Sequence, residues 1–71
     1  MSDTELEHLV QMANDIARNL AFNEDAAQRV ADHLQRFWAP VMRERIRAHV
    51  TAGGSGLSDL AMSAVKRLPE S

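Results

Sequence analysis

The sequence repeats apolar residues at intervals of three and four, and three short segments interrupt this pattern: Asn23, Ala39-Pro40 and Ala52 to Gly56. Such intervals indicate amphipathic helices, because they place apolar side chains on one face. Proline and glycine clusters mark the ends of helices. The sequence therefore predicts an all-α fold, a small bundle of about four short helices over residues 4–22, 24–38, 40–51 and 59–68.

The residues at the interruptions predict how each helix begins and ends. Thr4 with Glu7 fits a capping box at the first helix, and Asn23 is the predicted break and the N-cap of the second. Pro40 ends the second helix and opens the third, because proline suits a first helical position and disfavours helical angles in the preceding residue. Gly53 fits the left-handed position after the third helix, and Ser58 fits the N-cap of the fourth.

The length of the chain limits its own stability. Its 71 residues suffice for a single domain over residues 1–71, and a chain of this size buries only about 60% of the surface that its unfolded form exposes. Cysteine is absent, so neither disulfides nor thiolate-bound metals can stabilise the fold. Small domains without such support rely on tight helix packing or a partner, so the composition favours a protein that works as a subunit.

Charge is distributed unevenly along the chain. The formal net charge is −2, yet between positions 36 and 47 four arginines accompany a single acidic residue, Glu44. Arginine binds carboxylates through its planar fork, so this segment favours a partner protein over nucleic acid, for which no motif is present. No apolar run approaches the ~20 residues of a membrane span, and the acidic start is unlike a signal peptide. We expect a cytoplasmic protein that binds neither nucleic acid nor a membrane.

Few residues of the chain are suited to catalysis or to metal binding. His8 and His33 lie on polar helix faces, without the spacing of a metal site. His49 lies on an apolar stripe, where a packed imidazole bonded to a backbone carbonyl is favoured over an interface contact. Ser55 lacks the strand-to-helix context of a nucleophile elbow, and four short helices leave no room for a closed pocket. We expect no catalytic, metal or cofactor-binding residue, and no enzymatic activity of this chain by itself.

The glycine-rich segment, Gly53-Gly54-Ser55-Gly56, has two interpretations. Loop amides before a helix can hold a phosphate, but Asp59 in the next helical turn would repel the anion, and no Lys-Ser/Thr pair follows as in a P-loop. A helix C-cap and hinge is therefore the favoured interpretation.

The aromatic pair Phe37-Trp38 is predicted to serve both the core and a partner. The two rings lie about 100° apart on a helix, so both are buried only if the buried face is broad. We expect at least one ring in the core and one shared with a partner, because Trp and Arg are enriched at binding hot spots. The third helix also carries a second apolar strip, which suggests a further packing partner.

Several segments resemble the delta subunits of soluble NAD-dependent formate dehydrogenases, over about residues 8–68. The segments are Met12 to Arg18, His33 to Trp38, Pro40, Met42-Arg43, and Ala52-Gly53-Gly54 with Gly56-Leu57. The most specific part is the Phe-Trp-x-Pro-x-Met-Arg run followed by Ala-Gly-Gly-x-Gly-Leu. The chain departs from the family at Ala39, where Asp is common, at Val41, where a basic residue is common, and at Ser55, where Glu is common.

The resemblance implies a subunit of a multi-subunit enzyme. Other subunits of that family carry the molybdenum or tungsten bis-guanine dinucleotide cofactor, the iron–sulfur clusters, FMN and the NAD site. The resulting hypothesis is a non-catalytic accessory subunit that docks on the catalytic subunit of formate dehydrogenase and aids assembly, stability or molybdenum-cofactor maturation. The predicted docking residues are Arg36, Phe37, Trp38, Pro40, Met42, Arg43, Gly53, Gly54 and Gly56.

Two alternatives remain open. One is a small chaperone that binds the guanine dinucleotide form of the molybdenum cofactor, with the arginines contacting its phosphates. The other is a homo-oligomeric helical adaptor unrelated to formate oxidation. For the isolated chain we expect a homodimer formed through the exposed apolar strip.

Overall fold

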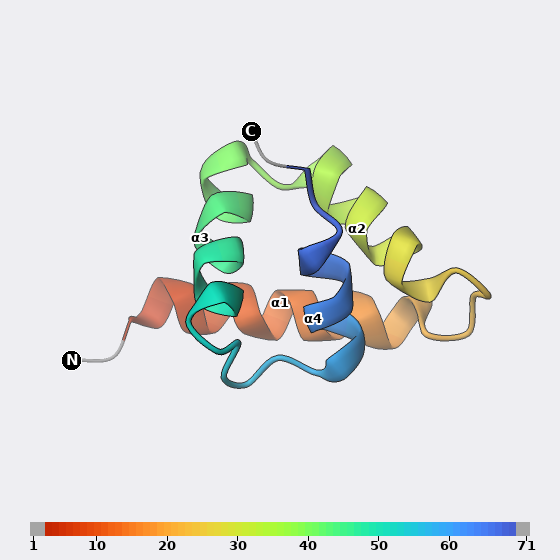
Figure 1. The fold of residues 1–71 in the computed structure, drawn as a ribbon, viewed down its shortest axis with the longest axis horizontal. Coiled ribbons are helices and arrows are strands. Elements are labelled where there is room, and N and C mark those ends of the chain that lie inside the picture. The colour runs from red at the N-terminus through yellow and green to blue at the C-terminus, as the bar shows by residue number, and fades with distance from the viewer. Residues whose placement is uncertain (1–2, 70–71) are drawn as a thin grey trace.

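The computed structural model describes residues 3–69 as four helices that pack around a shared core (Figure 1). The helices are α1 (Thr4–Leu20), α2 (Ala26–Phe37), α3 (Pro40–Thr51) and α4 (Asp59–Lys66). The described residues contain no strand, and the predicted all-α bundle of four short helices is confirmed. Within residues 3–69, none of the helices combines the length and the apolar character needed to cross a membrane.

The first helix begins at a different cap from the predicted one. Asp3 is the N-cap, and its carboxylate accepts the amide N–H of Leu6 at 3.0 Å. The predicted Thr4 cap is therefore wrong by one residue. Glu5 and Glu7 lie in the first turn, where a carboxylate is favoured by the positive end of the helix dipole.

Asn23 closes α1 and does not cap α2. Its side-chain Nδ2 donates to the carbonyl of Leu20 at 3.0 Å, and its backbone amide donates to the same oxygen at 3.1 Å. The N-cap of α2 is Asp25, which makes no side-chain cap bond. The predicted N-cap at Asn23 is wrong, and α1 ends two residues before, and α2 begins two residues after, the approximate predicted bounds of 22 and 24, because Asn23 satisfies the preceding turn.

The junction between α2 and α3 follows the prediction closely. Trp38 and Ala39 are both extended, with ψ angles of 142° and 149°, and Pro40 opens α3. The second helix thus ends at Phe37, one residue before the predicted end. The chain reverses from one helix to the next within two residues, which places the end of α2 beside the start of α3.

The shortest helix, α4, contacts the other three, and in Figure 1 it lies in front of α1 between α2 and α3. It ends at Lys66, two residues before the predicted end, although Leu68 beyond it is still buried. Small side chains on α4 allow close packing on all sides, since interiors tolerate few voids. The buried core consists of Leu9, Ala13, Ala17, Val30, Ala31, Leu34, Trp38, Ile46, Leu57, Ala61, Ala64, Val65 and Leu68.

Candidate functional site

The aromatic pair at the end of α2 is divided between the core and the surface. Trp38 is only 5% exposed and belongs to the core cluster, whereas Phe37 is 68% exposed. The extended conformation of Trp38 turns the chain at this residue, so the two rings no longer share a helical face. The apolar spacing of the second helix predicts Phe37 on the same face as Val30 and Leu34; this prediction is wrong, and Trp38 is the one ring in the core, as expected of the pair.

The ring of Phe37 is held in place by its neighbours on α2. The ring of His33, one helical turn earlier, lies 4.7 Å away between centroids and is tilted by 44°. The guanidinium carbon of Arg36 lies 5.9 Å from the Phe37 centroid, at the outer limit of a cation–π contact. These contacts orient an exposed aromatic side chain, which lowers the entropy that a partner must remove on binding.

Arg43 reaches back from α3 to the end of α2. Its Nη1 donates to the carbonyl of Gln35 at 3.2 Å and also to the carbonyl of Trp38. The last carbonyls of a helix have no partner within it and carry partial negative charge. Arg43 satisfies one of these groups, at Gln35, together with the carbonyl of the C-cap residue Trp38, so it fastens the α2–α3 junction from within. Nearby, Met42 is half-buried against the core and Pro40 is exposed.

The other predicted docking residues form the end of α3. Gly53 has a φ of 124° and donates to the Val50 carbonyl at 3.0 Å, while Gly54 donates to the His49 carbonyl at 2.9 Å. This pair of bonds is the Schellman pattern, and it confirms the predicted position of Gly53 just after the helix, one residue beyond the C-cap Ala52. Gly54 is buried with a φ of 68°, and a Cβ built on it would lie 2.6 Å from Cε of Met62, so a side chain here would be strained and would displace the end of the Met62 side chain.

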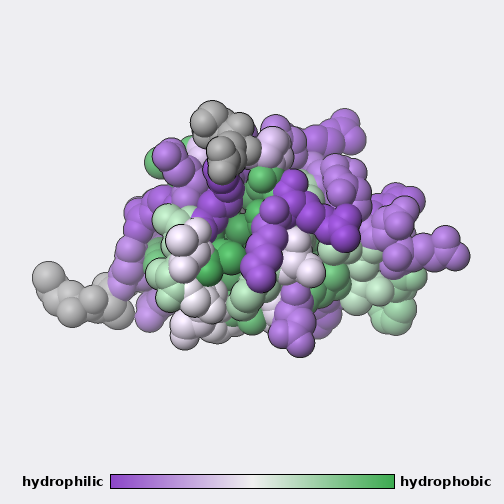
Figure 2. All heavy atoms as spheres, in the orientation of Figure 1, coloured by the Kyte–Doolittle hydropathy of each residue, from purple (hydrophilic) through white to green (hydrophobic). Residues whose placement is uncertain are grey.

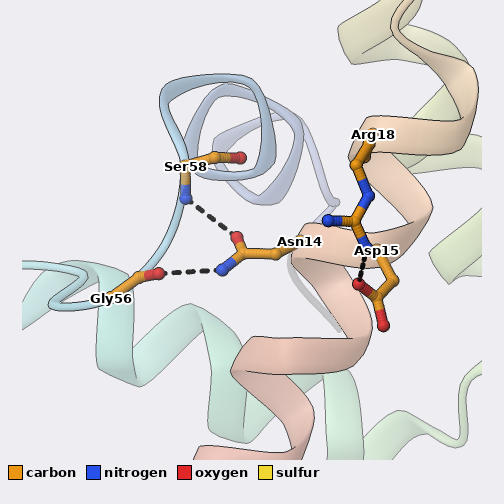
Figure 3. Close-up of polar contacts among 5 residues, drawn as sticks. All are labelled: Asn14, Asp15, Arg18, Gly56 and Ser58. Carbon is orange, nitrogen blue, oxygen red and sulfur yellow. Dashed lines mark hydrogen bonds and ion pairs between the residues drawn. The ribbon is translucent and has the colours of Figure 1, made fainter.

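An α1 residue opposite the apolar stripe of the helix holds the same segment (Figure 3). The side chain of Asn14 donates from Nδ2 to the carbonyl of Gly56, and its Oδ1 accepts the amide N–H of Ser58, both at 2.8 Å. The two backbone partners determine the amide orientation, because one only accepts and the other only donates. The sequence gives one sign of this role: Asn14 lies in the interior of a predicted helix, where asparagine is unfavourable.

His49 fastens the segment from the side of α3. Its Nε2 lies 2.7 Å from the carbonyl oxygen of Ser55, so this nitrogen donates the hydrogen bond. The imidazole is half-buried, and the prediction of a packed histidine bonded to a backbone carbonyl is confirmed. With Asn14 on one side and His49 on the other, the glycine-rich segment is tied to two helices.

The amides of this segment are largely committed to partners inside the chain. Besides the two C-cap bonds, Leu57 donates to the Gly54 carbonyl at 3.0 Å and Ser58 donates to Asn14. Ser58 is the N-cap of α4 as predicted, and its side chain accepts the amide of Ala61 at 3.2 Å. These internal bonds engage the amides of Gly53, Gly54, Leu57 and Ser58, which counts against the phosphate-loop interpretation because such a loop holds an anion through free amides.

The arginines that cluster in the sequence between positions 36 and 47 separate in space. Arg43 binds the end of α2, while Arg45 binds the carboxylates of Asp3 and, at 3.3 Å, Glu5 at the start of α1. Arg36 lies beside Phe37. Arg36, Arg43 and Arg45 therefore have different partners within the chain, and exposed ion pairs such as those of Arg45 contribute little to stability.

Residues 3–69 bring no group of three or more His, Cys, Asp or Glu side chains together in a geometry suited to a metal ion. With no cysteine in the sequence, the donor set of this chain does not fit an iron–sulfur cluster, which is held by thiolates.

A hollow of about 520 Å³ lies between α3 and α4, and apolar side chains are visible in it among polar ones in Figure 2. Its apolar part includes Val50, Val65 and Leu68, and its charged rim includes Glu44 and Lys66. Val41, on the second apolar strip of α3, is 63% exposed. The packing partner predicted for that strip stays a prediction.

Comparison with known proteins identifies the family of this chain. Neither a curated protein nor a solved structure matched it. Residues 8–65 match the family described as NADH-dependent formate dehydrogenase delta subunit, FdsD. The match reaches from α1 to Val65 in α4 and includes Asn14, the α2–α3 junction and the glycine-rich segment. It confirms the resemblance that the aromatic–proline run and the glycines indicate. The chain belongs to the family of NADH-dependent formate dehydrogenase delta subunits.

Proposed function

We propose that this chain is a non-catalytic accessory subunit that docks on the catalytic subunit of an NADH-dependent formate dehydrogenase. In this role it aids the assembly or stability of the complex, or the maturation of its molybdenum cofactor. The observation that carries the docking proposal is the 68% exposure of Phe37 beside Arg36, while the adjacent Trp38 is buried. A small domain that leaves an oriented aromatic ring outside its own core supports a role in protein binding.

The nine predicted docking residues have two kinds of role in this proposal. Arg36, Phe37 and Pro40 are exposed at the α2–α3 junction and contact the partner directly. Trp38 and Arg43 hold that junction together from inside, and Met42 supports it from the core side. Gly53, Gly54 and Gly56 shape the loop after α3, at the edge of the docking region.

In the proposal, the metal cofactor, the iron–sulfur clusters, FMN and the NAD site are carried by other subunits. The chaperone alternative requires a basic surface for the phosphates of a guanine dinucleotide. It gains no support from Arg43 and Arg45, because carbonyls and carboxylates of the chain itself engage their guanidinium groups.

The direct test compares formate dehydrogenase made with and without this chain. The complex is purified through a tag on the catalytic subunit from cells that contain or lack the intact chain, and yield, metal content and formate oxidation are measured. We expect the intact chain to copurify in stoichiometric amount. Without it, we expect less assembled complex or less metal in each complex.

A tagged version of this chain provides the reciprocal capture. We expect it to retain the catalytic subunit through a wash at physiological salt, which screens long-range non-specific attraction. Complex of unchanged yield, metal content and activity in cells lacking the chain, together with no capture of the catalytic subunit, would contradict the proposal.

A further inference from the structure

A shallow hollow lies between the end of α1 and the outward face of α2, next to the exposed ring of Phe37. Its volume is about 270 Å³, slightly below the roughly 300–1,000 Å³ of small-molecule sites. The hollow therefore suits side chains of a protein segment better than a cofactor. Its lining residues are Leu20, Arg29, Asp32, His33, Arg36 and Phe37.

The lining combines an apolar anchor with a positive charge. Arg29, His33 and Arg36 recur at intervals of four and three, so they share one face of α2, and both arginines are exposed. The carboxylate in the hollow, Asp32, accepts a hydrogen bond from Nε2 of Gln28 at 2.9 Å. Two guanidinium groups against one carboxylate make this face positive, although the whole chain carries a formal charge of −2.

We infer that this face of α2 binds an acidic segment of the partner subunit, in which a carboxylate meets Arg36 and an apolar side chain packs on Phe37. The inference rests on the proposed docking function and adds the chemistry of the segment that is bound. Arginine receives carboxylates in a bidentate geometry, and an oriented aromatic ring beside it resembles the aromatic and arginine anchors of binding hot spots.

Charge argues against a second copy of this chain as the occupant. A two-fold dimer places the same surface patch on both sides of the interface. The patch carries two arginines against one aspartate, so both sides of such an interface would have a net positive charge, and like charges at an interface oppose association. A partner segment with carboxylates complements the same surface and removes this repulsion.

The test measures affinity between the full-length chain and purified formate dehydrogenase lacking this subunit, by biolayer interferometry at several salt concentrations. Phe37→Ala removes the anchor, and Arg36→Glu reverses the charge. Phe22→Ala and Arg18→Glu are matched controls, because Phe22 is 97% exposed and Arg18 is an exposed arginine of α1, and neither lines the hollow. Circular dichroism and light scattering establish that each variant is folded and report its oligomeric state.

We expect Phe37→Ala and Arg36→Glu each to weaken binding at least tenfold, while both controls stay within twofold of the wild type. Wild-type affinity should also fall as salt rises, and Arg36→Glu should reduce that salt dependence. If either variant binds with wild-type affinity, this inference is overturned, while the proposed docking function still stands. A wild-type dimer that Phe37→Ala dissociates assigns the face to a second copy and also overturns it. Failure of the wild-type chain to bind at all overturns the proposed function.

Discussion

Replacing Asn14 by alanine tests how the glycine-rich segment is held to α1. The substitution removes two hydrogen bonds, to the Gly56 carbonyl and from the Ser58 amide, both 2.8 Å long. Each bond contributes about 0.5–1.5 kcal/mol net, so the loss is about 1–3 kcal/mol. Alanine recovers up to about 0.7 kcal/mol through its higher helix propensity. With the full recovery, the expected decrease in the free energy of unfolding is about 0.3–2.3 kcal/mol.

The assay is urea unfolding of the full-length chain, followed by far-UV circular dichroism and by the fluorescence of Trp38. Trp38 is the single tryptophan and is 5% exposed, so its emission reports loss of the core. A domain of this size loses roughly 4–8 °C in Tm for each kcal/mol, and heating provides a second measurement of the same change.

Asn19→Ala is the matched control, because Asn19 is an exposed asparagine of the same helix. It carries the same gain in helix propensity without the two bonds, so it should be neutral or slightly stabilising. If the two variants unfold within about 0.5 kcal/mol of each other, the usual scatter of surface substitutions, Asn14 does not hold the segment and the reasoning is wrong.

Three further substitutions probe the same framework by urea unfolding. Gly54→Ala should lose at least about 1–2 kcal/mol, because alanine is strained at a φ of 68° and its Cβ would approach Cε of Met62 to 2.6 Å; an unchanged midpoint would disprove this strain. Ser58→Ala should lose about 1 kcal/mol through its cap bond, whereas Ser63→Ala, at an exposed position of α4, should not, and equal midpoints would contradict the cap. Arg43→Met keeps a long side chain but removes the donors to the carbonyls of Gln35 and Trp38. We expect the free energy of unfolding to fall by about 1–3 kcal/mol and the near-UV circular dichroism of the buried tryptophan to change. A native near-UV signal at wild-type stability would refute this role.

The structural roles of Arg43 and Trp38 make these two residues unsuitable for testing docking. Arg43 and Trp38 combine a prominent place in the family resemblance with a structural role in the junction. Substituting either one would weaken the fold and the docking surface together, so a loss of binding could not be assigned. Phe37 and Arg36 are exposed, and changing them probes the surface with little effect on the core.

Much of the local structure could be predicted, because its causes lie within a few residues. Proline opens α3 since its fixed φ suits a first helical turn, and Gly53 follows that helix since glycine tolerates a positive φ. Ser58 caps α4 by the same local chemistry. The caps at the first two helices were harder to predict, because Asp3 and Thr4, or Asn23 and Asp25, are equally plausible from composition.

The candidate site could be predicted from the sequence only in part. The aromatic and arginine residues of the junction could be singled out as a group, because their types are typical of protein interfaces. Which ring is buried depends on one extended residue, Trp38, whose backbone rotates it away from the helical face that Phe37 occupies. The inward role of Arg43 depends on the sharp reversal at Ala39-Pro40, which brings its guanidinium onto carbonyls five and eight residues earlier.

The sequence by itself determined the four helices, the junction at Pro40, the cap at Gly53 and the family, because each follows from residue type and short spacing. Only the tertiary structure decided that Asn14 bonds to Gly56 and Ser58, which are 42 and 44 positions further along the chain. It also decided that His49 donates to Ser55 and that Phe37 stays outside the core. The physical reason is that these contacts arise only once α4 has packed among the other three helices. Helical periodicity records which face is apolar, but it does not record which polar groups the packing will bring within hydrogen-bonding distance.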